Sequence, residues 1–100
     1  MLSPASQDAL KELGKNIRSA RILRHLSQKL LAERAGIARS TVQQIENGCA
    51  GVAVGKYVQA LDVLGIVTHL SRVACFDYSW TKKLADEITS CHRVRVKQQS

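Results

Sequence analysis

A short stretch of the sequence, RSTVQQIENG at residues 39–48, carries side chains that are suited to hydrogen bonding. Its apolar residues are three apart, the spacing of one helix face, and they leave the polar residues on the other faces. These polar residues are Arg39, Ser40, Gln43, Gln44 and Asn47. Guanidinium and amide groups make paired hydrogen bonds to guanine and adenine in the major groove of DNA. A solvated helix face is the alternative interpretation, although such faces usually carry Lys and Glu.

Catalytic and metal-binding chemistry has little support in this chain. The reactive side chains are those of His25, His69, His92, Cys49, Cys75 and Cys91. No histidine has a carboxylate or a nucleophile placed to form a catalytic pair. The cysteines are odd in number, far apart and without a C-x-x-C motif, so we interpret them as reduced thiols. We expect no enzyme activity, no metal and no cofactor.

The length and charge of the chain limit its fold and its partners. One hundred residues suffice for one hydrophobic core. The net charge of +7 favours a polyanionic partner, which could be nucleic acid, an anionic membrane surface or an acidic protein. We recognise neither an apolar run long enough to span a membrane nor a signal peptide, and therefore expect a cytoplasmic protein that does not enter membranes.

Hydrophobic spacing and turn residues predict four helices before residue 66, over residues 4–24, 28–36, 39–47 and 54–64. Ser3 or Ser6 can cap the first helix, and Ser27 can cap the second. Gly36 allows the tight turn between the second and third helices. Two short helices joined by such a turn form a helix-turn-helix unit, whose second helix enters the DNA major groove. This placement favours DNA contact over a solvated face for residues 39–48.

Residues 66–73 differ in character from the helices before them. Ile66, Val67, Thr68 and Val73 are β-branched, and polarity roughly alternates, so we predict a strand. A lone strand cannot satisfy its own backbone groups, and the sequence offers no second obvious strand. We therefore expect the same strand of a second copy to pair with it, which predicts a homodimer.

The residues after 74 are expected to form a separate segment, so that the domains are 1–74 and 75–100. Apolar residues four apart, from Trp80 to Ile88, predict a fifth helix. This stripe either packs against the domain or its dimer mate, or docks a partner protein. The basic tail that follows contacts DNA phosphates, an acidic partner or nothing. The candidate partner contacts are Trp80, Leu84, Arg93 and Arg95.

The segment HLSQKLLAERAGIARSTVQQIENG, residues 25–48, resembles the helix-turn-helix of Cro/cI or XRE-type regulators of bacteria and phages. The motifs are L-S-Q, L-A-x-x-A-G-I, S-T-V-x-x-I-E-N-G and A-L-x-x-L-G-I, and the resemblance extends over about residues 10–66. It implies an all-α, five-helix, lambda-repressor-like DNA-binding domain. To this we add the short C-terminal strand that pairs across the homodimer.

The resemblance also implies roles for particular residues. Base edges are read by Arg39, Ser40, Gln43 and Gln44, although Gln43 could instead only border the groove. The DNA backbone is contacted by Gln28, Asn47 and Lys56. A structural pair is formed by Arg21 and Glu46, so these two residues are assigned to stability.

The sequence departs from the family pattern at two positions. Ala38 stands where Ser or Thr normally caps the third helix, a loss of about 1 kcal/mol of local stability. Leu30 is apolar where a charged residue is usual, and is either a spare surface leucine or part of a protein contact.

The segment VGKYVQALDVLGIVTHL, from residue 54 onward, further resembles the helix-then-strand ending of HipB-like antitoxins. Those antitoxins repress their own operon and hold a kinase-type toxin. The sequence thus predicts a sequence-specific repressor that binds a palindromic, double-stranded DNA operator as a homodimer and acts as the antitoxin of a HipBA-like toxin-antitoxin operon. The alternative is a stand-alone phage-type or housekeeping XRE repressor without a toxin partner.

Overall fold

The computed structural model describes residues 1–74, in which the regular elements are all helices. The elements are α1 (Pro4–Leu23), α2 (Gln28–Ala35), α3 (Arg39–Glu46), α4 (Val54–Val63) and the 3-10 helix η1 (Val67–Arg72). One compact unit, Met1–Val67, contains all four α-helices. No helix in residues 1–74 has the length and apolar character needed to cross a membrane. The expected fifth helix and the boundary at residue 75 lie outside the described residues and stay predictions.

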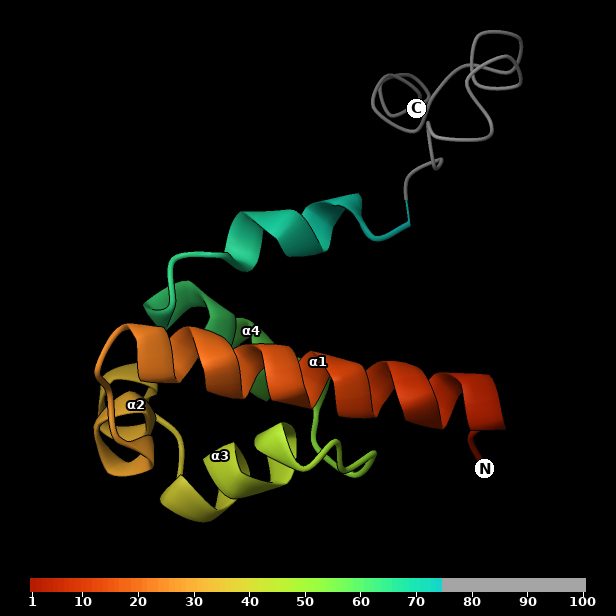
Figure 1. Ribbon diagram of the computed structural model, residues 1–100, viewed down its shortest axis with the longest axis horizontal. Coiled ribbons are helices and arrows are strands. Elements are labelled where there is room, and N and C mark those ends of the chain that lie inside the picture. The colour runs from red at the N-terminus through yellow and green to blue at the C-terminus, as the bar shows by residue number, and fades with distance from the viewer. Residues whose placement is uncertain (75–100) are drawn as a thin grey trace, which may run out of the picture. The chain divides into compact units, whose positions relative to one another are not determined.

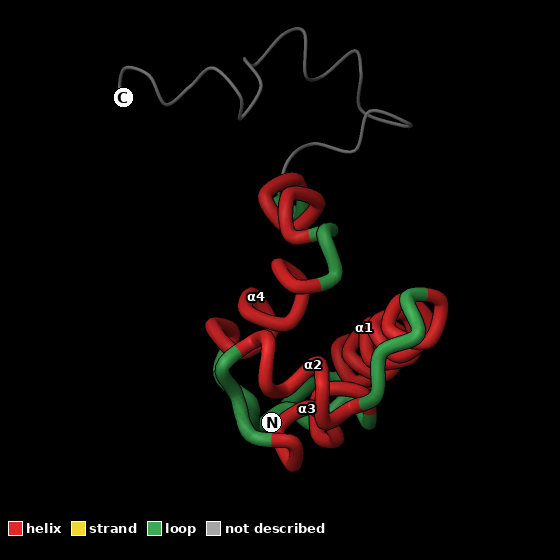
Figure 2. The backbone as a smooth tube through the Cα atoms, turned by 90° about the vertical axis from the view of Figure 1, so that its left-hand side faces the viewer, coloured by secondary structure: helices red, strands yellow, loops and turns green. Residues whose placement is uncertain are grey.

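The four α-helices are arranged around the α2–α3 pair. α3 packs against α2 and α1, and α2 packs against α4. Figure 1 shows the long helix α1 extending past the end of α3. In Figure 2, α1 and α4 lie on opposite sides of α2 and α3. The two outer helices therefore support the central pair from two directions.

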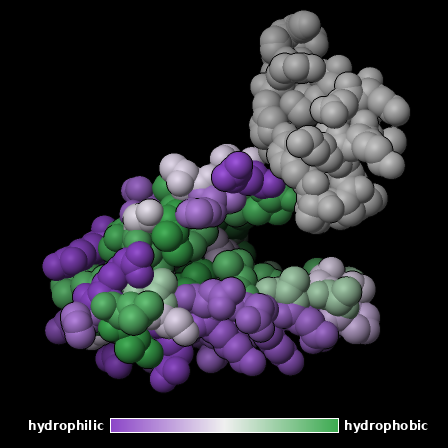
Figure 3. Space-filling model, turned by 45° about the horizontal axis from the view of Figure 1, so that its top comes forward, coloured by the Kyte–Doolittle hydropathy of each residue, from purple (hydrophilic) through white to green (hydrophobic). Residues whose placement is uncertain are grey.

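The core of this unit is mainly aliphatic, with Tyr57 as an aromatic member. Its largest fully buried side chains, in order of size, are Ile17, Leu31, Ile45, Leu64 and Val42. On the face drawn in Figure 3, hydrophilic residues make up much of the outer surface and apolar residues gather toward the middle. Each of the four α-helices or its C-terminal cap contributes at least one of these buried residues, so burial of apolar surface holds the helices together.

Serine caps begin the first two helices. The Ser3 side chain accepts a hydrogen bond from the Ser6 amide at 3.1 Å, with Pro4 at the first helical position. Of the two expected caps, Ser3 is therefore the one used. Ser27 caps α2 in the same way, accepting from the Leu30 amide at 3.0 Å.

All four α-helices end in the same turn, in which one residue has a positive φ. These residues are His25, Gly36, Gly48 and Gly65. At Gly36 the amide of Ile37 donates to Ala32 and that of Gly36 to Glu33, the paired hydrogen bonds of a Schellman motif. At the end of α1 the positive φ of 57° falls on a histidine, where glycine would be less strained.

The predicted strand at residues 66–73 is wrong, because this segment contains the 3-10 helix η1. Within the described residues no second strand is available to pair with a strand here. A 3-10 turn satisfies the backbone locally, and the Ser71 hydroxyl adds a hydrogen bond to the carbonyl oxygen of Thr68 at 2.9 Å. The β-branched residues indicated a strand, but β propensity depends on a partner. The proposed pairing of strands across a dimer therefore loses its structural element.

The backbones of α1 and α3 approach each other closely at Gly14. A Cβ atom added there would lie 2.6 Å from the carbonyl oxygens of both Ile45 and Glu46. Glycine inside a helix costs about 0.5–1 kcal/mol relative to alanine, so the helix propensity of α1 is reduced at this position. The close approach explains why a larger residue does not fit.

We predict that Gly14→Ala destabilises the protein by about 2 kcal/mol, because the added methyl group pushes α1 away from α3. Chemical denaturation measures the change in the free energy of unfolding. The control is Gly55→Ala in α4, where no atom lies within 4 Å of an added Cβ, and which should be neutral or slightly stabilising. Equal effects of the two substitutions would contradict the close-packing argument.

Candidate nucleic-acid interface

The helix-turn-helix unit consists of α2, the turn at Gly36 and α3. Leu31 and Ala35 of α2 are buried, as are Val42 and Ile45 of α3. Because these apolar side chains fill the inner side of the pair, the remaining faces of α3 are left to solvent. The core therefore determines which side of α3 is presented outward.

The outward face of α3 and its C-cap carry the five polar residues singled out in the sequence. These are Arg39, Ser40, Gln43, Gln44 and Asn47, and all five are exposed. The side-chain hydrogen bonds found within residues 1–74 involve none of them. Exposed donors and acceptors without partners in this part of the chain are available to an external ligand.

The buried side of α3 carries an ion pair with α1. Arg21 Nε donates to Glu46 Oε2 at 2.7 Å and Nη2 donates to Oε1 at 3.2 Å. The two side chains are only 10% and 3% exposed. A third donor, Arg21 Nη1, bonds the carbonyl oxygen of Leu26 at 2.8 Å. The guanidinium thus connects α1, the loop before α2 and the end of α3.

Gln28 joins this network from the first turn of α2. Its Nε2 donates to Glu46 Oε1 at 3.1 Å, so its side chain is oriented by the ion pair. An amide group has two N–H donors, and one remains for another acceptor. The phosphate contact implied for Gln28 is compatible with this arrangement and stays a prediction.

α4 follows the C-terminal end of α3 in the chain. Lys56 is exposed there, and the next residue, Tyr57, is 6% exposed. The Tyr57 hydroxyl donates to the carbonyl oxygen of Cys49 at 3.2 Å. Burial, and secondarily the nearby Cys49, raise the pKa of Tyr57 above its usual value, so the phenol remains a protonated donor at neutral pH.

The hydrogen bonds made by Gln59 and Tyr57 were not predicted from the sequence. Gln59 Nε2, on α4, donates to the carbonyl oxygen of Ala35 at 3.2 Å, just before the turn into α3. Neither this contact nor that of Tyr57 has a sequence signal, because each joins a side chain of α4 to the backbone of another segment. Ala38, as expected, provides no side-chain hydrogen bond to the start of α3.

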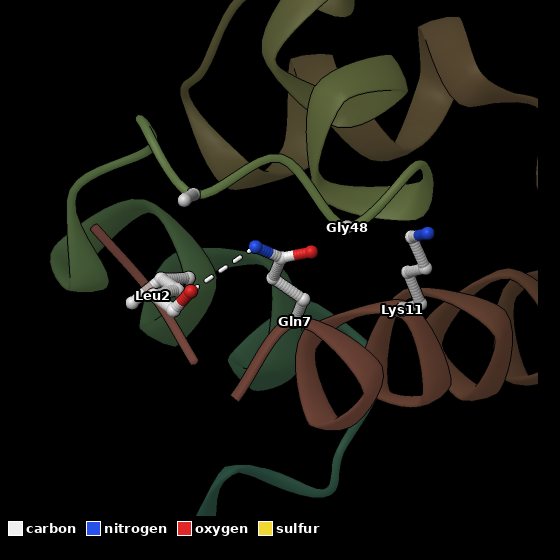
Figure 4. Close-up of a pocket in the computed structure, with 5 residues that line it drawn as sticks. Leu2, Gln7, Lys11 and Gly48 are labelled. Carbon is white, nitrogen blue, oxygen red and sulfur yellow. Dashed lines mark hydrogen bonds between the residues drawn. The ribbon is translucent and has the colours of Figure 1, made fainter. Parts of the chain in front are cut away.

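A cavity of about 270 Å³ lies where α1 passes the turn that follows α3. It is lined by Leu2, Gln7, Lys11, Gly48 and Ala50. Figure 4 shows the Lys11 side chain beside Gly48 and the hydrogen bond from Gln7 Nε2 to the Leu2 carbonyl oxygen. The cavity brings one cationic side chain to the C-terminal end of α3.

The other candidate groups have the following places. Cys49 is an exposed free thiol three residues after the end of α3. No cluster of three or more metal-binding side chains occurs among the described residues. Leu30 is half-buried on α2. The candidate partner contacts at Trp80, Leu84, Arg93 and Arg95 lie outside the described residues.

We predict that Glu46→Gln destabilises the protein by about 3 kcal/mol, because it leaves the buried Arg21 guanidinium without a countercharge. Urea denaturation at neutral pH measures the effect. Glu33→Gln, on the exposed face of α2, is the matched control and should change the free energy of unfolding by less than about 0.5 kcal/mol. The argument fails if the two variants are equally stable.

Comparison with known proteins agrees with this geometry. A family model described as helix-turn-helix matches residues 17–69, more than half of the chain. A chain in the solved structure of the SinR protein/SinI protein complex is 29% identical to this one, with a TM-score of 0.52, and the match covers 86% of this chain and 85% of that one. No curated protein matches the sequence. The Cro/cI resemblance and the lambda-repressor-like fold are confirmed, and the chain belongs to the XRE-type helix-turn-helix family of DNA-binding transcription regulators.

Proposed function

We propose that this protein is a sequence-specific repressor that inserts α3 into the major groove of its operator. The observation that carries the proposal is the row of five exposed hydrogen-bonding side chains on α3 and its C-cap, which have no side-chain hydrogen bonds among the described residues. Arg and Gln side chains suit guanine and adenine edges respectively. The chain's net charge of +7 adds general attraction to the phosphate backbone.

Within this proposal the residues divide into two roles. Arg39, Ser40, Gln43 and Gln44 read base edges, and contacts at base edges provide sequence preference. Gln28, Asn47 and Lys56 bind phosphates and fix the register of α3 on the duplex. All of the base readers belong to α3, while the backbone contacts flank it on α2, at its C-cap and on α4. Such flanking contacts are suited to orienting a short helix in the groove.

The proposed regulator binds a palindromic operator as a homodimer. α3 has eight residues and is only about 12 Å long, so one copy reads only a few base pairs. Two copies related by a two-fold axis place their recognition helices about 34 Å apart, one turn of DNA, and double the recognised sequence. The dimer contact is not assigned to residues 66–73, which contain no strand.

One observation favours a second, compatible function. The similar SinR/SinI structure is a complex of two different proteins. We infer that the present regulator also binds a partner protein. If it is the antitoxin of a HipBA-like operon, the partner is a kinase-type toxin and the candidate contacts are Trp80, Leu84, Arg93 and Arg95. A stand-alone repressor without a toxin is the alternative.

The two functions differ in the genes expected beside this one. A kinase-like neighbouring gene whose product co-purifies with the tagged full chain, when the two are expressed together, is expected for the antitoxin. A solitary gene, or one in a phage lysogeny region, favours the plain repressor. Co-expression with no co-purification would contradict the antitoxin function while leaving DNA recognition intact.

We predict that Arg39→Ala and Gln44→Ala each reduce the preference for the operator over a scrambled duplex by about tenfold or more, because each removes paired hydrogen bonds to a base. Binding to the scrambled duplex falls much less. Titration of both duplexes at one fixed salt concentration measures the ratio.

The control for these variants is Arg18→Ala, which removes an exposed arginine from α1 rather than α3. It should leave the ratio of the two affinities unchanged. An unchanged ratio in both Arg39→Ala and Gln44→Ala would exclude α3 as the reading helix.

A further inference from the structure

Two side chains of α4 hold the backbone on either side of α3. Gln59 Nε2 donates to the carbonyl oxygen of Ala35, four residues before α3 begins, at 3.2 Å. The Tyr57 hydroxyl donates to the carbonyl oxygen of Cys49, three residues after α3 ends, also at 3.2 Å. Both hydrogen bonds are partly buried, which lessens competition from water. Helix α4 therefore holds the chain both before and after the candidate reading helix.

α3 depends on such external support. Eight residues are too few for a stable isolated helix in water, so its position is determined by what surrounds it. Its N-terminal cap, Ala38, contributes no side-chain hydrogen bond. The Arg21–Glu46 pair anchors its last residue, and Val42 and Ile45 anchor its inner face. Apolar packing is less directional than hydrogen bonding. The Arg21–Glu46 pair and the hydrogen bonds of Tyr57 and Gln59 therefore contribute most to the orientation of the ends of α3.

Tyr57 also lies beside a candidate phosphate contact. Lys56, the preceding residue, is exposed, whereas the Tyr57 ring is 6% exposed and packed in the core. Two adjacent residues of α4 therefore carry the candidate phosphate contact and the hydroxyl that bonds the chain after α3.

We propose that Tyr57 and Gln59 are positioning residues, which set the orientation of α3 and thereby its discrimination between DNA sequences. The proposal rests on the proposed function of α3 as the base-reading helix. Paired hydrogen bonds to a base edge are sensitive to displacements of well under 1 Å, because both donor–acceptor distances must be met together. Loss of either hydrogen bond allows such displacements while the apolar core remains in place.

The test uses the full chain and the variants Tyr57→Phe, Gln59→Met and the double variant. Phe retains the packed ring and loses only the hydroxyl, and Met approximates the shape of Gln without its donor. The unchanged protein first selects its preferred duplex from a random pool. Every variant is then titrated against that duplex and a scrambled one, at the same salt concentration and well below its melting temperature.

Each single variant should lose about fivefold in affinity for the selected duplex, the typical net effect of one hydrogen bond, while its affinity for the scrambled duplex is unchanged. The double variant should lose about 25-fold if the two ties act independently. Amide hydrogen exchange in α3 should also become faster in the free variants, because the ends of the helix are less restrained.

Three control variants separate positioning from general destabilisation. Ile17→Val weakens the core and leaves the hydrogen bonds of Tyr57 and Gln59 in place. Ser71→Ala removes a hydroxyl-to-carbonyl hydrogen bond in η1. Neither should change the ratio of the two affinities. Lys56→Ala should weaken binding to both duplexes equally, as loss of a phosphate contact does.

The possible contradicting results are distinct. Failure of the unchanged protein to select any sequence overturns the proposed function, and this inference with it. A clear selection followed by unchanged ratios in Tyr57→Phe and Gln59→Met overturns the positioning role alone. A reduced ratio in Ile17→Val equal to theirs does the same, since it assigns the effect to stability. If Tyr57→Phe does not fold, Gln59→Met at its exposed position decides the question.

Discussion

The buried ion pair between Arg21 and Glu46 is the interaction on which the arrangement of this domain depends. Removing two charges from water is costly, and the cost is offset only when geometry and additional hydrogen bonds satisfy both groups. Here the guanidinium bonds both carboxylate oxygens and the Leu26 carbonyl, while Gln28 bonds the same carboxylate. One buried cluster thus joins α1, α2 and α3. Because it requires particular distances, it fixes the end of α3 more specifically than apolar contact alone.

The rest of the packing supports the same helix without using its outer face. Gly14 lets the backbone of α1 lie against the last carbonyl groups of α3, and Tyr57 and Gln59 hold the chain on either side of it. All of these contacts reach α3 or its flanking turns from the side of the core. The polar residues opposite are therefore left exposed and without partners in the described part of the chain, as a helix that reads DNA requires.

Local signals in the sequence were sufficient for most of the helical structure, because capping and turn formation involve neighbouring residues. The hydroxyl of Ser27 and the positive φ of Gly36 act within a few residues of their own positions, and the bounds of α2 and α3 follow from them. The same reasoning failed at residues 66–73, where β-branched residues indicated a strand. A strand requires a partner at a distance, and η1 satisfies its backbone locally. Residues 75–100 lie outside the described structure.

By itself, the sequence determined the helix-turn-helix unit, the family, and the five polar residues of the candidate interface, since these depend on spacing along a helix. It indicated the Arg21–Glu46 pair only through a family resemblance. The tertiary structure alone decided which other residues hold α3 in position. Gly14, Tyr57 and Gln59 act on backbone atoms that are 8–32 residues away in the chain, and no local pattern encodes such contacts. They exist because long-range packing of the core brings those backbone atoms within reach.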